Sequence, residues 1–131
     1  MSNKFPVYLM VALIFILCMA SFIFASDASV ILAELNRLKI KVIGSIQPQD
    51  SEFPAEFNGP YWGLLANVCK QGGYNLDAYA GKKAKIVNLP VNNPARTLNV
   101  VAFSCDEKIV CVYFVDSTTV PGMEPVVNSK K

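Results

Sequence analysis

The chain begins with an apolar segment that is too long and too uniform to be an ordinary element of a small soluble domain. Residues Phe5–Ala25 contain 21 consecutive residues without a charged side chain, preceded by Lys4 and followed by Ser26 and Asp27. Because a helix rises about 1.5 Å per residue, such a run is long enough to cross the roughly 30 Å hydrocarbon core of a bilayer. The folded domain is therefore expected after this run, in residues 26–131, which are 106 of the 131 residues.

Two interpretations of residues 1–25 stay open, a secretory signal peptide and a single transmembrane anchor. The sequence Ile23-Phe24-Ala25 ends on a small residue, as signal cleavage sites do. However, the run exceeds the usual hydrophobic region of a signal, about 7–15 residues, and Lys4 is the only basic side chain before it. Either interpretation predicts a protein that is secreted or held in the cell membrane through residues 5–25.

The orientation of an anchor depends on the charges that flank it, because basic side chains favour the cytoplasmic side. Arg37, Lys39 and Lys41 follow the run and outnumber Lys4 and the terminal amino group. The tail before the run is nevertheless very short, which is typical of insertion that translocates the larger C-terminal part. We therefore expect the domain to lie outside the cytoplasm.

Composition excludes several classes of function. The chain has 12 basic and 10 acidic side chains, a formal net charge of +2, so it lacks the basic surface that nucleic-acid binding requires. It contains no histidine, which excludes Ser-His-Asp and Cys-His nucleophile systems and mixed Cys/His zinc sites. We therefore predict no catalytic residue, no cofactor, no metal ligand and no nucleic-acid partner.

Three cysteines lie outside the apolar run, namely Cys69, Cys105 and Cys111. An odd number does not make a complete disulfide framework, although one bridge with a free thiol is an alternative. Cys69 lies on an apolar helical stripe and Cys111 lies in an apolar strand pattern. We therefore expect three buried, reduced thiols with a structural role.

The hydrophobic pattern after residue 25 predicts two helices and four strands. Asp27 is a candidate N-cap of the first helix, Pro60 suits the first turn of the second, and Gly72-Gly73 would end it. The expected helices are residues 28–38 and 60–71, the expected strands are residues 40–46, 83–89, 97–105 and 108–115, and residues 47–59 are expected to form a loop. The segment Asp106-Glu107 predicts a hairpin turn between the last two strands.

The predicted order, helix-strand-helix-strand-strand-strand, indicates an α+β fold. Two amphipathic helices suffice to cover one face of a three- to four-stranded, mainly antiparallel sheet. Pro90 removes a ladder donor, so the strand before it is expected to lie at a sheet edge or to end there. We assign residues 26–118 to the domain and residues 119–131 to an irregular C-terminal tail.

Several short motifs resemble an uncharacterised domain-of-unknown-function family. They are Phe53-Pro54-Ala55-Glu56-Phe57, the helix end Cys69-Lys70-Gln71-Gly72-Gly73-Tyr74-Asn75-Leu76, Tyr79-Ala80-Gly81-Lys82-Lys83, and Asn93-Pro94 before the hairpin. Members of this family are small, N-terminally anchored or secreted extracytoplasmic proteins of Gram-positive bacteria. The similarity runs from about Leu32 to Met123, and the chain departs from the family's Gly-Gly-Asp pattern near Cys111-Val112-Tyr113. The resemblance implies the fold and an extracytoplasmic location in a bacterium. It implies no catalytic activity, because the activity of the family is unknown.

A few loop residues are candidates for a site. Asp50, Glu52 and Glu56 form an acidic loop, but no glycine-centred loop with regularly spaced ligands accompanies them, so a solvated loop is favoured over a calcium site. Trp62 is expected to flank the second helix, and Tyr79 to pack in a turn. The candidate partner-facing residues are Trp62, Tyr79, Lys82 and Lys83.

These patterns favour a non-catalytic extracytoplasmic or membrane-anchored binding protein whose ligand the sequence does not identify. Its expected partners are the membrane, through residues 5–25, and a protein or envelope component. One alternative is a small envelope-acting enzyme that uses loop carboxylates, Glu52 with Glu56 or Asp106 with Glu107. Another is an accessory subunit of a membrane complex.

Overall fold

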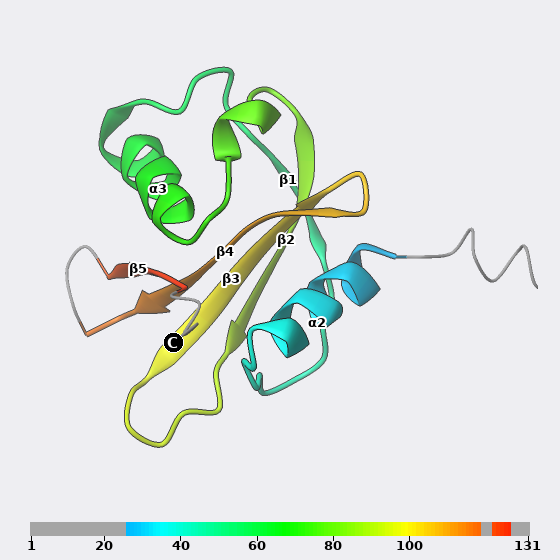
Figure 1. The fold of residues 1–131 in the computed structure, drawn as a ribbon, viewed down its shortest axis with the longest axis vertical. Helices are drawn as coiled ribbons and strands as arrows, with labels where there is room; N and C mark the ends of the chain where they lie inside the picture. The colour runs from blue at the N-terminus through cyan, green and yellow to red at the C-terminus, as the bar shows by residue number, and fades with distance from the viewer. Residues whose placement is uncertain (1–25, 119–121, 127–131) are drawn as a thin grey trace, which may run out of the picture.

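The computed structural model describes residues 26–118 and 122–126, and these form an α+β domain with two α-helices and a five-stranded sheet (Figure 1). The elements are α2 (Asp27–Arg37), β1 (Gln49–Glu52), α3 (Gly59–Gln71), the 3-10 helix η1 (Leu76–Tyr79), β2 (Lys83–Pro90), β3 (Leu98–Cys105), β4 (Lys108–Asp116) and β5 (Met123–Pro125). The predicted α+β class is confirmed, but the sheet has five strands and not the three to four that were predicted. The predicted signal or anchor lies outside the described residues, and none of the helices in residues 26–118 and 122–126 is long and apolar enough to cross a bilayer.

The sheet is an antiparallel meander in which neighbouring strands follow the order of the chain, β1-β2-β3-β4-β5. The predicted hairpin joins β3 to β4. Its two central residues, Asp106 and Glu107, have φ angles of 51° and 62°, as the tight turns that match strand twist require. β2 lies between β1 and β3 and ends at Pro90, so its predicted end is confirmed and its predicted edge position is wrong.

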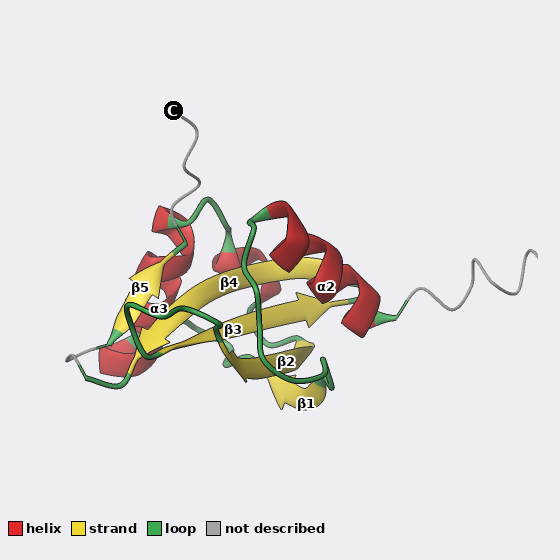
Figure 2. Ribbon diagram, turned by 90° about the horizontal axis from the view of Figure 1, so that it is seen from below, coloured by secondary structure: helices red, strands yellow, loops and turns green. Residues whose placement is uncertain are grey.

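The two helices lie on opposite faces of the sheet, which corrects the prediction that they share one face. Successive side chains of a strand point to opposite faces. On β3, Val101 and Phe103 pack in the hydrophobic cluster that contains α3, whereas Val100 and Ala102 pack in the cluster that contains α2. Figure 2 shows α2 and the loop after it against the twisted sheet, with α3 behind β4 and β5. β3 is apolar at nearly every position, which is the pattern of a strand covered on both sides, and the prediction of one covered face overlooked this signal.

The N-terminus of α2 is capped by Ser26, not by Asp27 as predicted. The backbone N–H of Ser29 donates to the Ser26 hydroxyl oxygen at 3.3 Å. The Asp27 carboxylate instead accepts hydrogen bonds from the Ser104 hydroxyl at 2.8 Å and from the backbone N–H of Glu107 at 3.2 Å. Asp27 therefore ties the start of α2 to β3 and to the hairpin turn.

The strand predicted at residues 40–46 is wrong. This segment makes one isolated bridge, Val42 to Val91, and is otherwise a loop whose apolar side chains cover the α2 side of the core. The edge of β2 is paired instead by β1, which falls in the predicted loop, and Asp50 faces Lys85 across that pair. A further strand, β5, falls in the predicted irregular tail and extends the sheet beyond β4.

A disulfide joins Cys69 of α3 to Cys111 of β4, with a Cα–Cα distance of 5.6 Å. The prediction of three reduced thiols is therefore wrong for these two cysteines, and the alternative of one bridge with a free thiol is the observed arrangement. Among the cysteines that the structure describes, Cys105 is the free thiol, and it is buried. The sequence could not specify the pair, because a helical stripe and a strand 42 residues apart meet only in the fold.

We predict that Cys69→Ala with Cys111→Ala lowers the free energy of unfolding by about 3–4 kcal/mol, because the bridge closes a long loop in the unfolded chain. Denaturant unfolding under non-reducing conditions measures this loss. The parent protein in reductant is the matched control and should fall to the stability of the double variant. Equal stabilities of the parent protein with and without reductant would contradict the prediction.

A charged cluster fastens β5 to the rest of the sheet. The Arg96 guanidinium donates to the buried carboxylate of Asp116 at 2.7 Å and to Glu124 of β5 at 2.6 Å. The hydroxyl of Thr118 donates to the other oxygen of Asp116 at 2.5 Å. These contacts, the Thr118 hydrogen bond foremost, lower the pKa of Asp116 to about 2.

This shift predicts a specific loss of stability in acid. The folded pKa of Asp116 lies below the value of about 3.9 for an unfolded aspartate, so ionisation stabilises the fold above about pH 4. That contribution is lost as the pH falls towards about 2. We expect Asp116→Asn to flatten the fall in stability between about pH 4 and 2, and Thr118→Val to flatten it in part, as measured by denaturant unfolding at each pH. Parallel profiles for the parent protein and Asp116→Asn would refute the assignment.

Candidate functional site

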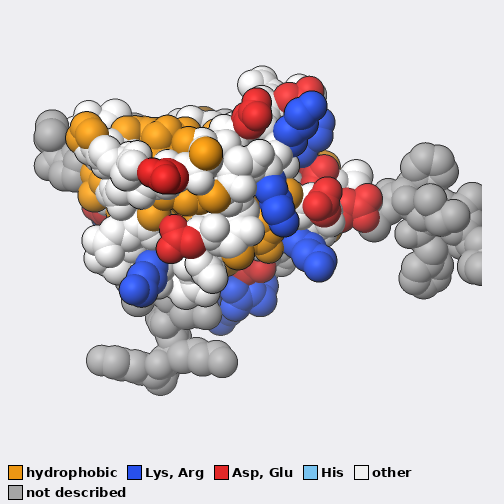
Figure 3. Space-filling model, turned by 90° about the horizontal axis from the view of Figure 1, so that it is seen from above, with side chains coloured by type: hydrophobic (Ala, Val, Ile, Leu, Met, Phe, Trp, Pro, Cys, Tyr) orange, Lys and Arg blue, Asp and Glu red, His pale blue; other side chains and the backbone are white. Residues whose placement is uncertain are grey.

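A charged depression lies where the start of α2 meets β1, β2 and the β3–β4 turn. It is open to solvent and has a volume of about 790 Å³. Figure 3 shows acidic and basic side chains interleaved on the right side of the molecule, whereas hydrophobic side chains gather towards the left. The depression is lined by Asp27, Asp50, Ser51, Glu52, Lys83, Ala84, Lys85, Ser104, Cys105, Asp106 and Glu107.

Cross-strand pairs between β1 and β2 organise the charges of the depression. Asp50 faces Lys85 in an ion pair, and Glu52 faces Lys83 in the ladder. Opposite charges at directly facing positions stabilise a strand pair, which explains why this polar segment forms β1. The hydrogen bond and positive charge of Lys85 lower the pKa of Asp50. Asp50 is therefore held as a carboxylate, which suits ionic contact and not proton donation.

Cys105 lies at the wall of the depression but is not an activated nucleophile. Its side chain is 3 % exposed, and its thiol donates to the backbone carbonyl of Lys83 at 3.2 Å. Burial, assisted by the negative charge of Asp106, raises the pKa of the thiol. Thiolate formation is therefore disfavoured, and the thiolate is the reactive form.

We predict that Cys105 reacts with a water-soluble thiol reagent in the native protein far more slowly than in the unfolded protein, because its thiol is both buried and protonated. A chain with Cys18→Ala isolates this thiol, since Cys69 and Cys111 are bridged. Absorbance-detected labelling with and without denaturant measures the two rates. Equal rates would show that Cys105 is accessible in the folded domain.

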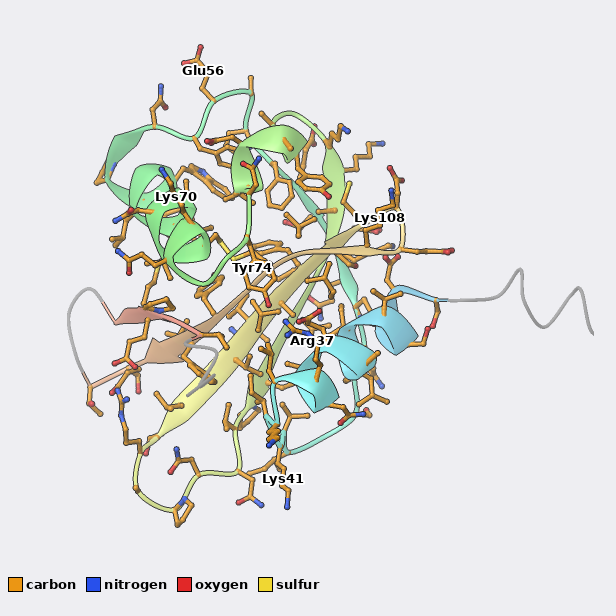
Figure 4. The ribbon with its side chains drawn as sticks, in the orientation of Figure 1. Arg37, Lys41, Glu56, Lys70, Tyr74 and Lys108 are labelled. Carbon is orange, nitrogen blue, oxygen red and sulfur yellow. A yellow bond between two sulfur atoms is a disulfide. The ribbon has the colours of Figure 1, made fainter. Side chains whose placement is uncertain are left out.

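The structure brings some of the predicted loop acids together and leaves one apart. Asp50, Glu52 and Asp106, which come from β1 and the hairpin turn, line the same depression. Glu56 does not line it, accepts a hydrogen bond from the side-chain amide of Asn58 at 3.0 Å, and points outward in Figure 4. Within the part of the chain that the structure describes, no group of three or more Cys, Asp or Glu side chains is arranged to hold a metal ion.

The predicted partner-facing residues lie in different local surroundings. Lys83 lines the charged depression, and the Lys82 ammonium lies 5.6 Å from the ring centroid of the half-buried Tyr79. Trp62 is half-buried at the start of α3, where its ring centroid lies 6.3 Å from that of the buried Phe53. Trp62 therefore packs at the edge of the core.

A second hollow, which we call the α2 groove, runs between α2 and the loop at residues 40–46. It has a volume of about 810 Å³ and is mainly apolar. Its lining residues are Ser26, Ala28, Ser29, Leu32, Leu35, Asn36, Ile40, Lys41, Val42, Gly44, Ser45, Ile46 and Asn92. The sequence does not predict this groove, because residues 40–46, which form its far wall, have the pattern of a strand of the sheet.

No protein-family model, no curated protein and no solved structure matches the chain. The resemblance to a family of extracytoplasmic proteins stays a prediction, and the function has to be argued from the two hollows, the disulfide and the sequence of residues 1–25.

Proposed function

We propose that this protein is a non-catalytic binding protein that acts outside the cytoplasm, secreted or held in the membrane through residues 5–25. The observation that carries the proposal is the Cys69–Cys111 disulfide. Disulfides form and persist in oxidising compartments and are rare in reducing ones. A bridged domain directly after a run of 21 uncharged residues fits export better than retention in the cytoplasm.

The chemistry of the charged depression supports binding over catalysis. Its carboxylates face lysines across a strand pair, the pKa of Asp50 is lowered, and the pKa of the Cys105 thiol is raised. A general acid needs a raised carboxyl pKa, and a thiol nucleophile needs a lowered one. The pKa of Asp50 is lowered where a general acid would need it raised, and the pKa of Cys105 is raised where a nucleophile would need it lowered. The depression therefore suits reversible ionic contact with a polar partner.

The second candidate is an enzyme that acts on an envelope polymer, and one observation favours it. Asp50, Glu52 and Asp106 gather in one hollow although they come from separate segments. Two carboxyl groups across a cleft are the minimum for glycoside hydrolysis. We test this candidate with Glu52→Gln and Asp106→Asn assayed on soluble envelope glycan fragments, and Glu56→Gln, outside the hollow, is the matched control. A turnover that is lost in the first two variants and kept in the control would establish the enzyme in place of the binding protein.

The location has its own test. We expect the full chain, tagged at its C-terminus, to fractionate with membranes or medium and to be degraded by protease added to intact cells. Alkylation before and after reduction should reveal two thiols that become reactive only on reduction, and Cys69→Ser should abolish that difference. Recovery of the chain in the cytosol with all thiols reduced would overturn the proposed function.

A further inference from the structure

We propose that the α2 groove docks onto a surface of anionic lipid headgroups. This inference rests on the anchored form of the proposed function, in which residues 5–25 stay in the membrane. The groove is then a second, weaker contact that sets how the domain lies on the bilayer.

The chain enters the domain at one end of the α2 groove. Ser26 follows the apolar run directly and is itself a lining residue of the α2 groove. Consecutive residues advance the chain by at most about 3.6 Å, so a run that ends at the interface holds this end of the groove beside the headgroups. A contact at such proximity forms without the entropy cost of a bimolecular encounter.

Exposed apolar side chains lie in and beside the α2 groove. The structure exposes three large hydrophobic side chains among the residues it describes, and two of them belong here. Leu32 lines the groove and is 47 % exposed, while Ile43, between two lining residues, is 56 % exposed. Single exposed apolar residues are ordinary, but a pair beside an apolar hollow is typical of an interaction surface.

The charged side chains at the α2 groove are basic. The lining of the α2 groove contains no acidic residue and includes Lys41. Lys39 and Lys41 are exposed, and neither forms an ion pair with a residue that the structure describes. Basic residues next to a membrane segment are attracted to anionic lipid. The acids near the start of α2 line the charged depression instead, and Asp27 is engaged by Ser104.

The geometry favours lipid over a protein occupant. A lipid surface needs exposed apolar side chains rimmed by unpaired basic groups, both of which this face offers at the point where the chain leaves the bilayer. Figure 4 shows the labelled Lys41 side chain extending away from the domain at the end near α2. Arg37 contributes little to this charge, because its guanidinium is paired with Glu34.

Tryptophan fluorescence in vesicles tests the proposal. The chain has one tryptophan, Trp62 in α3, so Ile43→Trp with Trp62→Phe moves the fluorophore to the groove. The full-length variant is reconstituted in phosphatidylcholine vesicles with and without phosphatidylglycerol, each with plain or brominated acyl chains. We expect brominated chains to quench the tryptophan at position 43 in vesicles with phosphatidylglycerol. The parent protein, with its tryptophan on the opposite side of the sheet, should be quenched much less.

Charge reversal supplies the matched variant. Adding Lys39→Glu and Lys41→Glu should remove most of the quenching while the chain still floats with the vesicles after an alkaline wash. Chains that stay with the vesicles but show no quenching at position 43 would overturn the docking alone, and so would equal quenching in vesicles without phosphatidylglycerol. A protected, unquenched tryptophan whose emission depends on protein concentration would assign the groove to a second copy of the chain.

Failure of the anchor gives a different result. If the chain washes off the vesicles, residues 5–25 do not hold it in lipid and the anchored form of the proposed function fails with the docking. If mass spectrometry of the exported protein shows cleavage after Ala25, the docking is overturned and the secreted form of the proposed function stands.

Discussion

The domain depends on one strand that is buried on both faces. β3 contributes Val101 and Phe103 to the α3 side of the core and Val100 and Ala102 to the α2 side. A domain of about 100 residues buries only part of its surface on folding. Because β3 is shared between the two layers, its side chains contribute to the core on both faces of the sheet. β2, β5 and both helices are positioned by their register or packing against β3 or its hairpin partner β4, and β1 is added through β2. A polar substitution at either face would therefore disturb a whole layer.

The disulfide holds α3 on its side of the sheet. α3 packs against β4 and the three-residue strand β5, near the edge of the sheet, and buries only Leu65, Val68 and Cys69. The bridge to Cys111 links α3 covalently to β4, the hairpin partner of β3. By contrast, α2 packs on β3 and β4 and is held at its start by the hydrogen bonds of Asp27. The two helices are thus fixed by different means, one covalent and one polar.

The sequence predicted elements wherever local chemistry decides them. Pro60 at the start of α3, Gly72 at its end and the Asp106-Glu107 turn act over a few residues, and each prediction is confirmed. The errors concern contacts between distant segments. The loop at residues 40–46 alternates like a strand, but its apolar side chains only cover the α2 side of the core. β1 is polar and became a strand because Lys83 and Lys85 of β2 face its acids, and no pattern within residues 49–52 reveals that partner.

The candidate sites also depend on contacts between distant segments, which sequence patterns do not reveal. Both hollows meet at the first residues of α2. Asp27 faces the charged depression, while Ser26 and Ala28 face the apolar α2 groove. Sequence analysis could single out Asp50, Glu52 and Asp106 as acids but not their assembly, which requires the β1–β2 ladder and the hairpin turn together. An anchor at residues 5–25 would enter the domain between these two surfaces. The lysine-rimmed apolar face then suits the bilayer, and the charged depression, around the start of the helix, is left to meet a polar partner.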